Sequence, residues 1–323
     1  MVSTGTTAAS RPELLGTIER IASRAHGDVS LSARLLRPSA ASGAEDGVAI
    51  AESVPVPTAS AIKVPIMITA LTLAERRALD LDRPVTVRPE ERAPGSGVLT
   101  LCDAEVRITL RDLIHLMIGV SDNTATNRVI REVGGSDAVN ACLAELGLPA
   151  TILRGGVTPA VLKEDPLLLG ESTTADMSAL MRMIAMETAI SPAVSRAAEA
   201  VLRRQQRLGQ SRRYLVNPAD PTMAGESSPL VLANKTGTLA GIRMDVGLVR
   251  FPSGNGFTYA VSYSHGVDPT ALAQESEGDI VCGLVVRELV RAWWSSEESG
   301  PAPVLPTPYA RLYGLPEETD GQA

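Results

Sequence analysis

The sequence predicts an α/β fold of the α+β kind, in which both ends of the chain build one sheet and a helical lobe is inserted between them. Apolar and polar residues alternate near the start, helical spacing dominates from about 60 to 210, and alternation returns after Pro229. With 323 residues, of which 44% are hydrophobic, the chain can bury a large core. We therefore expect two lobes that share a cleft.

The expected lobes follow these changes of pattern along the chain. The sheet lobe comprises 11–58 together with 228–295, and the helical lobe comprises 59–227. Residues 1–10 and 296–323 are rich in small, polar, Pro or acidic residues and are expected to form flexible tails.

Each element is predicted from its own periodicity. Pro12 to Ala25 spaces its apolar residues as an amphipathic helix does, and Val29 to Leu36 with Gly47 to Pro55 is typical of a hairpin. The predicted helices of the lobe are Val64 to Ala78, Leu110 to Ile118, Asn123 to Val133, Ala138 to Leu146 and Ala175 to Met186. The last predicted elements are strands Leu230 to Lys235, Asp245 to Phe251 and Phe257 to Ser264, and a helix from Ile280 to Trp294.

Composition excludes several classes of function. The 30 Lys and Arg residues face 37 Asp and Glu, a net charge of −7, so nucleic acid is not an expected partner. No apolar stretch is long enough to span a membrane, and no secretory signal is visible, which favours a cytoplasmic protein unless the chain was trimmed. We expect a small-molecule substrate, and a monomer or weak dimer.

Metal and cofactor sites are also not expected. The three cysteines Cys102, Cys142 and Cys282 are too scattered for a disulfide framework or a zinc site, and are interpreted as free, mostly buried thiols. The histidines have no partner pattern of a Ser-His-Asp triad.

Ser60 and Lys63 form the first candidate catalytic pair. They begin the first long predicted helix, and their spacing of three places hydroxyl and amine on one side of it. A serine hydroxyl needs a neighbouring base to become a nucleophile, and a lysine close to other cations can be neutral enough to serve. Taken alone, a serine at a helix start is usually just an N-cap.

Two further motifs follow in the order that such a site requires. Ser121, Asp122 and Asn123 stand at a loop-to-helix junction, where Asp122 is typical of a cap. The stretch Lys235-Thr236-Gly237-Thr238 closes a predicted strand, whose edge can pair with an extended substrate. Each motif alone also fits a purely structural interpretation, but their order and setting together favour chemistry.

These motifs, with the segments VPTASAIKVPIM, APGSGVL, LRDLIHLMIGVSDNTATN and KTGTLAGIRMDVGLV, resemble the class A β-lactamase and low-molecular-weight penicillin-binding protein superfamily from Leu14 to about Trp294. The resemblance implies a β-lactamase/transpeptidase-like fold, with a five-stranded antiparallel sheet, flanking helices and an inserted all-helical lobe. It also implies a serine hydrolase that forms an acyl-enzyme on β-lactams or D-Ala-D-Ala-like amides.

The same resemblance assigns roles to individual residues. Ser60 is the implied nucleophile, Lys63 its activator, Ser121 the proton relay to the leaving nitrogen, and Asn123 a binder of the substrate amide side chain. Lys235, Thr236, Gly237 and Thr238 would hold the substrate carboxylate and its strand-like edge, and the backbone N–H groups of Ser60 and Thr238 would form the oxyanion hole.

One part of the family pattern is missing. Class A β-lactamases carry an Ω-loop glutamate, followed four residues later by asparagine, that positions the hydrolytic water. Here Gly155, Gly156 and Val157 fall at the corresponding place. Glu164 is the nearest candidate base, although an acid in a polar loop is more often solvated.

Arg243 and the missing acid leave alternatives open. Arg243 can add a positive charge for the substrate carboxylate, or form an ion pair with Asp245 or another acid. Without a positioned base the acyl-enzyme would hydrolyse slowly, as in a D,D-peptidase or penicillin-binding protein. There are two competing interpretations. The first is a cytoplasmic esterase or amidase that acts on another acyl donor, and the second is a sensing protein that is acylated once.

Overall fold

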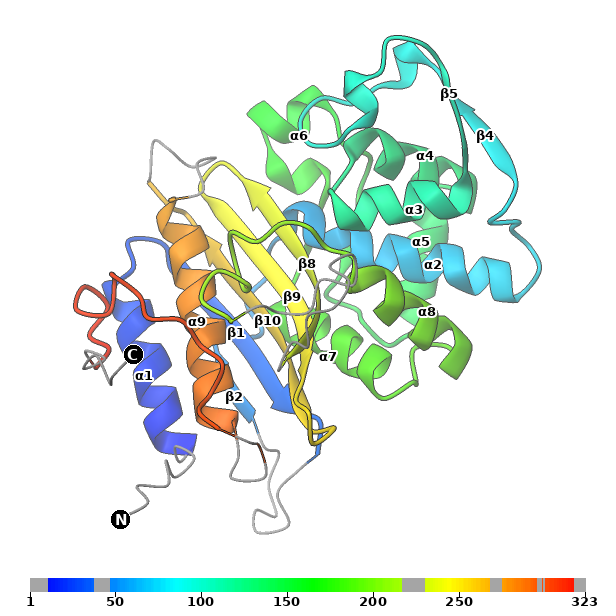
Figure 1. Ribbon diagram of the computed structural model, residues 1–323. Coiled ribbons are helices and arrows are strands. Elements are labelled where there is room, and N and C mark those ends of the chain that lie inside the picture. The colour runs from blue at the N-terminus through cyan, green and yellow to red at the C-terminus, as the bar shows by residue number, and fades with distance from the viewer. Residues whose placement is uncertain are drawn as a thin grey trace.

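The computed structural model, which describes residues 11–37, 47–216, 230–267, 275–294, 298 and 300–316, has a five-stranded antiparallel sheet at its centre (Figure 1). The strand order is β2-β1-β10-β9-β8, so the two ends of the chain do build one sheet, as predicted. The strands are β1 (Asp28–Leu35), β2 (Gly47–Ile50), β8 (Val231–Leu239), β9 (Ile242–Arg250) and β10 (Gly256–Ser264).

Helices cover both faces of this sheet. The terminal helices α1 (Arg11–Arg24) and α9 (Glu277–Trp293) lie side by side on one face, whereas α7 (Thr174–Ala185) and the helical lobe lie on the other (Figure 1). Each face buries its own apolar cluster. Ile18 of α1 and Leu284 of α9 belong to the cluster on the first face, and Met67 of α2 and Val246 of β9 belong to the cluster on the second. The two lobes are thus joined through the sheet.

The helical lobe contains more strand than expected. Its helices are α2 (Lys63–Glu75), α3 (Leu110–Gly119), α4 (Asn123–Val133), α5 (Ser136–Glu145), α6 (Pro159–Lys163) and α8 (Pro192–Leu202). It also holds the ribbon β4 (Pro84–Val87) with β5 (Val106–Thr109), and a small sheet of β3 (Val56–Pro57), β7 (Gly170–Ser172) and β6 (Ile152–Leu153). The inserted lobe is thus mainly helical, as expected, and its short strands were not predicted because they are too short to show a periodicity.

The boundary predicted for the first C-terminal strand is also wrong. β8 continues through the Lys235–Thr238 stretch to Leu239, and the turn to β9 falls at Gly241, whose φ is 66°. Gly237 is therefore not a turn residue. It stands in the strand because the backbone carbonyl of Thr58 approaches so closely that a Cβ would lie 2.8 Å from it.

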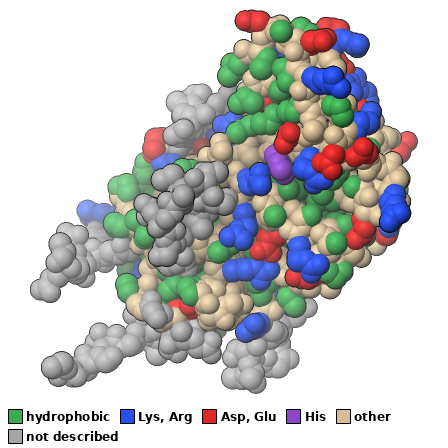
Figure 2. Space-filling view, turned by 45° about the vertical axis from the view of Figure 1, so that its right-hand side comes forward, with side chains coloured by type: hydrophobic (Ala, Val, Ile, Leu, Met, Phe, Trp, Pro, Cys, Tyr) green, Lys and Arg blue, Asp and Glu red, His purple; other side chains and the backbone are tan. Residues whose placement is uncertain are grey.

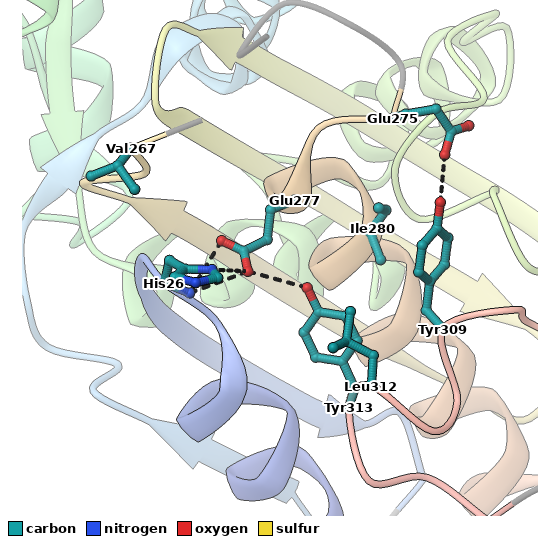
Figure 3. A pocket seen from close by; sticks show the side chains of 8 residues that line it. All are labelled: His26, Val267, Glu275, Glu277, Ile280, Tyr309, Leu312 and Tyr313. Carbon is teal, nitrogen blue, oxygen red and sulfur yellow. Dashed lines mark hydrogen bonds and ion pairs between the residues drawn. The ribbon is translucent and has the colours of Figure 1, made fainter. Parts of the chain in front are cut away.

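The C-terminal segment is packed instead of flexible over residues 300–316. Tyr313 and Leu315 are buried in the cluster between sheet, α1 and α9, and Arg24 donates to the carbonyl of Leu312. Glu277 joins this segment to the helices, accepting from the Tyr313 hydroxyl and pairing with His26, beside a cavity of about 380 Å³ (Figure 3). Composition suggested a tail, but aromatic residues anchor it. The other expected tail residues, 1–10 and 317–323, and the lobe boundary at 227–228 lie outside the described residues.

Candidate active site

The predicted nucleophile Ser60 lies in a 3₁₀ turn and not at the start of the long helix. This turn, η1, spans Ala59–Ile62, and α2 begins at Lys63. Ala59 has a φ of 45°, which side chains rarely adopt, and such strain is typical of functional sites. Because side chains three apart in a 3₁₀ helix eclipse one another, Ser60 and Lys63 lie on the same side of the turn.

The Lys63 amine is completely buried between η1 and the start of α4. It donates to the carbonyl and the hydroxyl oxygen of Ser121, at 2.9 and 3.0 Å, and to Oδ1 of Asn123 at 2.8 Å. Burial, followed by the charge of Lys235, holds the pKa of Lys63 well below its usual value. None of the hydrogen bonds found for Lys63 among the described residues goes to Ser60.

Ser121, Asp122 and Asn123 occupy the junction of α3 and α4, and each has a different task. Ser121 has a φ of 60° and directs its hydroxyl to Lys63. Asp122 caps α4 through the N–H of Ala125, as predicted for a cap, and also accepts from two N–H groups of the 93–102 loop. Asn123 donates to the carbonyl of Pro94, so its amide joins Lys63 to that loop.

The strand β8 brings Lys235 to the same place. β8 is the edge strand of the sheet, and it passes directly beside η1 at Gly237. Lys235 is fully buried, and burial, with the charge of Arg207 next, lowers the pKa of its ammonium to about 7. Thr236 is nearly buried, whereas Thr238 is exposed and its hydroxyl accepts a hydrogen bond from Gln210. Two lysines with lowered pKa values thus flank one serine turn.

Arg243 does not join this group. Its side chain is 1% exposed and its Nε donates to Asp279 at 2.8 Å, next to Ser276 at the start of α9. Arg243 pairs with Thr238 in the ladder, so it shares the face of the sheet opposite to Lys235. The ion-pair alternative therefore describes Arg243, with Asp279 as partner and in a buried place. A role of Arg243 in substrate binding stays a prediction.

The loop that faces the serine turn presents a leucine there. Leu162 of α6 packs against the cluster of Ala59, Leu239 and Ile242. Glu164 follows at the C-terminal end of α6, is exposed, and has no hydrogen bond from its carboxylate to a described residue. Residues two apart on a helix point in different directions, so the packing of Leu162 directs Glu164 away from the cluster.

The preceding part of this loop is held by its backbone. The Asn127 side chain accepts from the Val157 N–H at 2.7 Å and donates to the Val157 carbonyl at 2.8 Å. A Cβ on Gly156 would lie 2.7 Å from Oδ1 of Asn127, which accounts for a glycine at this position. The amide clamp fixes the loop next to α4 without supplying an acid.

Sequence reasoning missed two residues of the site. Arg207 and Gln210 belong to the segment after α8, and Gln210 donates to the carbonyl of Gly237 and the hydroxyl of Thr238. Arg207 lowers the pKa of both Lys63 and Lys235, so it stands close to both amines. The only sign of this segment in the sequence is the run of basic residues between α8 and β8, and such runs usually lie on solvated surfaces.

The described residues contain neither a metal-binding cluster nor a membrane-spanning helix. No group of three or more His, Cys, Asp or Glu side chains there is arranged to hold a metal ion. Within the ranges that the structure describes, no helix combines the length and apolar character that crossing a membrane requires. Acidic and basic side chains are mixed over the face shown in Figure 2.

The sheet with its inserted lobe, and the buried lysines beside a strained serine turn, define a protein of the serine-hydrolase kind. The chain belongs to the beta-lactamase enzyme family, whose model matches residues 14–293. Beta-lactamase L2 of Stenotrophomonas maltophilia is 38% identical over 91 residues, which are 28% of this chain and 30% of that protein. The chain thus aligns with less than a third of this curated relative.

Solved structures resemble the whole fold. The beta-lactamase of Sphaerobacter thermophilus is 27% identical with a TM-score of 0.72, over 86% of this chain and 96% of its own. A leucine-to-glutamate mutant of PBP-A, in an acyl-enzyme complex with penicillin G, has a TM-score of 0.71 over 90% of this chain and 99% of its own, at 23% identity. The fold expected from the motifs is therefore confirmed.

Proposed function

We propose that this protein is a serine acyl-transfer hydrolase that forms an acyl-enzyme at Ser60 with β-lactams or D-Ala-D-Ala-like amides and deacylates slowly. The observation that carries the proposal is the approach of two buried lysines to one serine turn: Lys63 through its bond to Ser121, and Lys235 on the strand that touches η1. Among the described residues neither lysine forms an ion pair, and burial without an opposite charge penalises an ammonium group strongly, so a purely structural role does not explain the pair.

The proposed acylation starts at Lys63. Its ammonium form has three N–H donors, and all three are used by Ser121 and Asn123. The lowered pKa favours the neutral amine, which keeps two donors and gains a lone pair. That lone pair takes the Ser60 proton while the Ser60 oxygen attacks the substrate carbonyl.

Collapse of the tetrahedral intermediate then needs a proton on the leaving nitrogen. The Ser121 hydroxyl is bonded to Lys63 and can pass that proton from the newly formed ammonium to the nitrogen, so the C–N bond breaks and Lys63 becomes neutral again. The N–H groups of Ser60 and Thr238 would stabilise the oxyanion, a contribution of about 3 kcal/mol per donor. Lys235 and Thr236 would hold the substrate carboxylate.

Deacylation is proposed to be slow because the loop opposite Ser60 presents Leu162 and no carboxylate. An apolar side chain neither orients nor deprotonates a water molecule. This packing favours a penicillin-binding, D,D-peptidase-like reaction over rapid β-lactam hydrolysis. We assign no deacylating role to Glu164.

Intact-mass spectrometry with benzylpenicillin, followed from seconds to hours, tests this proposal. The unmodified protein should gain the mass of one penicillin and keep it, whereas Ser60→Ala should gain none. Cys102→Ala is the matched control, because this cysteine is partly exposed and is a nucleophile outside the site. An adduct that survives in Ser60→Ala, or rapid drug consumption without a lasting adduct, would contradict the proposal.

A further inference from the structure

A hollow between three helices of the inserted lobe is separate from the serine turn. The helices α2, α3 and α8 pack against one another (Figure 1), and a hollow of about 270 Å³ opens between them. Its apolar lining consists of Leu71, Leu81, Ile114, Ala197, Ala200 and Val201. The lining includes no residue of η1, of the 121–123 junction or of β8, so this hollow is not part of the candidate active site.

The polar side chains that line the hollow are all basic. They are Arg111 and His115 of α3, and Arg204 shortly after α8. Arg111 donates to both carboxylate oxygens of Asp82, at 2.8 and 3.1 Å. Nδ1 of His115 lies 3.8 Å from a carboxylate oxygen of Asp112. Because an apolar pocket orients its ligand through the few polar groups that line it, a ligand for this hollow should carry an acidic group.

Arg204 is the basic residue that remains for such a group. Among the residues that the structure describes, its guanidinium has no acidic partner and no hydrogen bond. Its backbone is fixed, because its N–H donates to the Val201 carbonyl at 3.1 Å and its own carbonyl lies 3.2 Å from the place of a Cβ on Gly119. Burial, followed by the charge of Arg204, lowers the pKa of His115, so the guanidinium lies near this imidazole. A guanidinium in this setting is suited to bind a carboxylate through two N–H groups.

We propose that the hollow between α2, α3 and α8 is a binding site for free, medium-chain carboxylic acids. The carboxylate pairs with Arg204, and the chain packs against Ile114 and Val201. The volume is close to the lower limit of about 300 Å³ for small-molecule pockets, so a single short chain fits better than a two-chain lipid. The site is a second one, apart from the serine turn, and its ligand is bound without being acylated or cleaved.

NMR titration of the full chain with octanoate, octanol and butyrate tests the charge requirement. Octanoate should bind about tenfold or more tightly than octanol, because octanol lacks the charge that strengthens a hydrogen bond to a guanidinium. Butyrate should bind more weakly than octanoate, since each buried methylene contributes about threefold to fourfold. Arg204→Ala should remove the preference for octanoate over octanol, and Arg204→Lys should keep part of it. Arg203→Ala is the matched control, because it removes the same charge from a neighbour that does not line the hollow.

A second pair of variants tests the place of binding. Ala200→Phe should fill the hollow and abolish octanoate binding, and Ala200 is exposed, so the larger side chain does not disturb the core. Ala193→Phe is its control, since Ala193 is an exposed alanine of the same helix outside the lining. Octanoate binding that is absent, that equals the binding of octanol, or that survives in Arg204→Ala or Ala200→Phe overturns the proposal. None of these measurements involves Ser60, so the result does not depend on the proposed function.

Discussion

Lys235 is a residue whose charge state changes near neutral pH. Its ammonium is buried beside β9, and burial together with Arg207 brings its pKa to about 7, far below that of a solvated lysine. Below that pH the amine is protonated and attracts a carboxylate, and above it the attraction disappears. The strength of substrate binding should therefore depend on pH near neutrality.

Acylation by benzylpenicillin is expected to slow as pH rises through about 7, approaching a tenfold loss per unit. The methyl ester has no carboxylate for Lys235 and should not show this alkaline decline. Removal of Arg207 takes away a charge that lowers the pKa of Lys235, so Arg207→Ala should move the decline to higher pH. Stopped-flow acylation from pH 5 to 9 measures both profiles, and identical profiles for acid and ester would contradict the assignment.

The short helix α6 determines which side chain meets the acyl-enzyme. Thr158 caps this helix, which begins at Pro159 and is five residues long. Leu162 of this helix packs against the cluster that contains Ala59. The amide clamp of Asn127 on Val157 holds the approach to this helix. The element therefore presents an apolar surface where a water-activating group would be needed for rapid turnover.

A carboxylate at this position should accelerate deacylation. Leu162→Glu is expected to shorten the lifetime of the penicillin adduct at least tenfold, since general-base catalysis contributes about a hundredfold or more when the geometry is right. Leu168→Glu is the control, because Leu168 belongs to the same loop and is 45% exposed. The decay of the adduct mass is measured for both variants. Equal lifetimes in Leu162→Glu and the unmodified protein would show that α6 does not face the acyl group.

At the scale of the whole molecule, the C-terminal segment completes the core on the α1 and α9 face. Residues 300–316 add Tyr313 and Leu315 to that core, and Arg287 of α9 donates to the Leu305 carbonyl. The face that the segment covers is opposite to the cleft, so its contribution is to stability and not to chemistry.

Deletion of residues 300–323 should lower the free energy of unfolding by about 3 kcal/mol or more, because two large apolar side chains leave the core. Deletion of 317–323 alone should have little effect, since both buried residues remain. Urea denaturation followed by circular dichroism compares the two truncations. Equal midpoints would mean that the segment adds nothing to the fold.

The sequence by itself determined the order of the sheet and helical elements and the residues of three motifs. Alternation and helical spacing locate most of the longer strands and helices, because burial on one face forces that periodicity. The helix α8 was not predicted. The motifs predicted Ser60, Lys63, Ser121 and Lys235 as one site, and the structure places Lys63, Ser121 and Lys235 beside the turn that carries Ser60. Their catalytic roles stay a prediction.

Only the tertiary structure decided which charged residues reach the cleft. The sequence does not distinguish Arg243 from Arg207, but Arg243 pairs with Asp279 at the start of α9, whereas Arg207, in the segment after α8, donates to the carbonyl of Val120, the residue before Ser121. The sequence also does not show which of Leu162 and Glu164 faces the serine turn, because the directions of their side chains depend on where α6 begins. A motif is a local stretch of sequence. The electrostatic potential and the solvent access of a site depend on segments that are distant in the chain, and the positions of these segments are fixed only when the core packs.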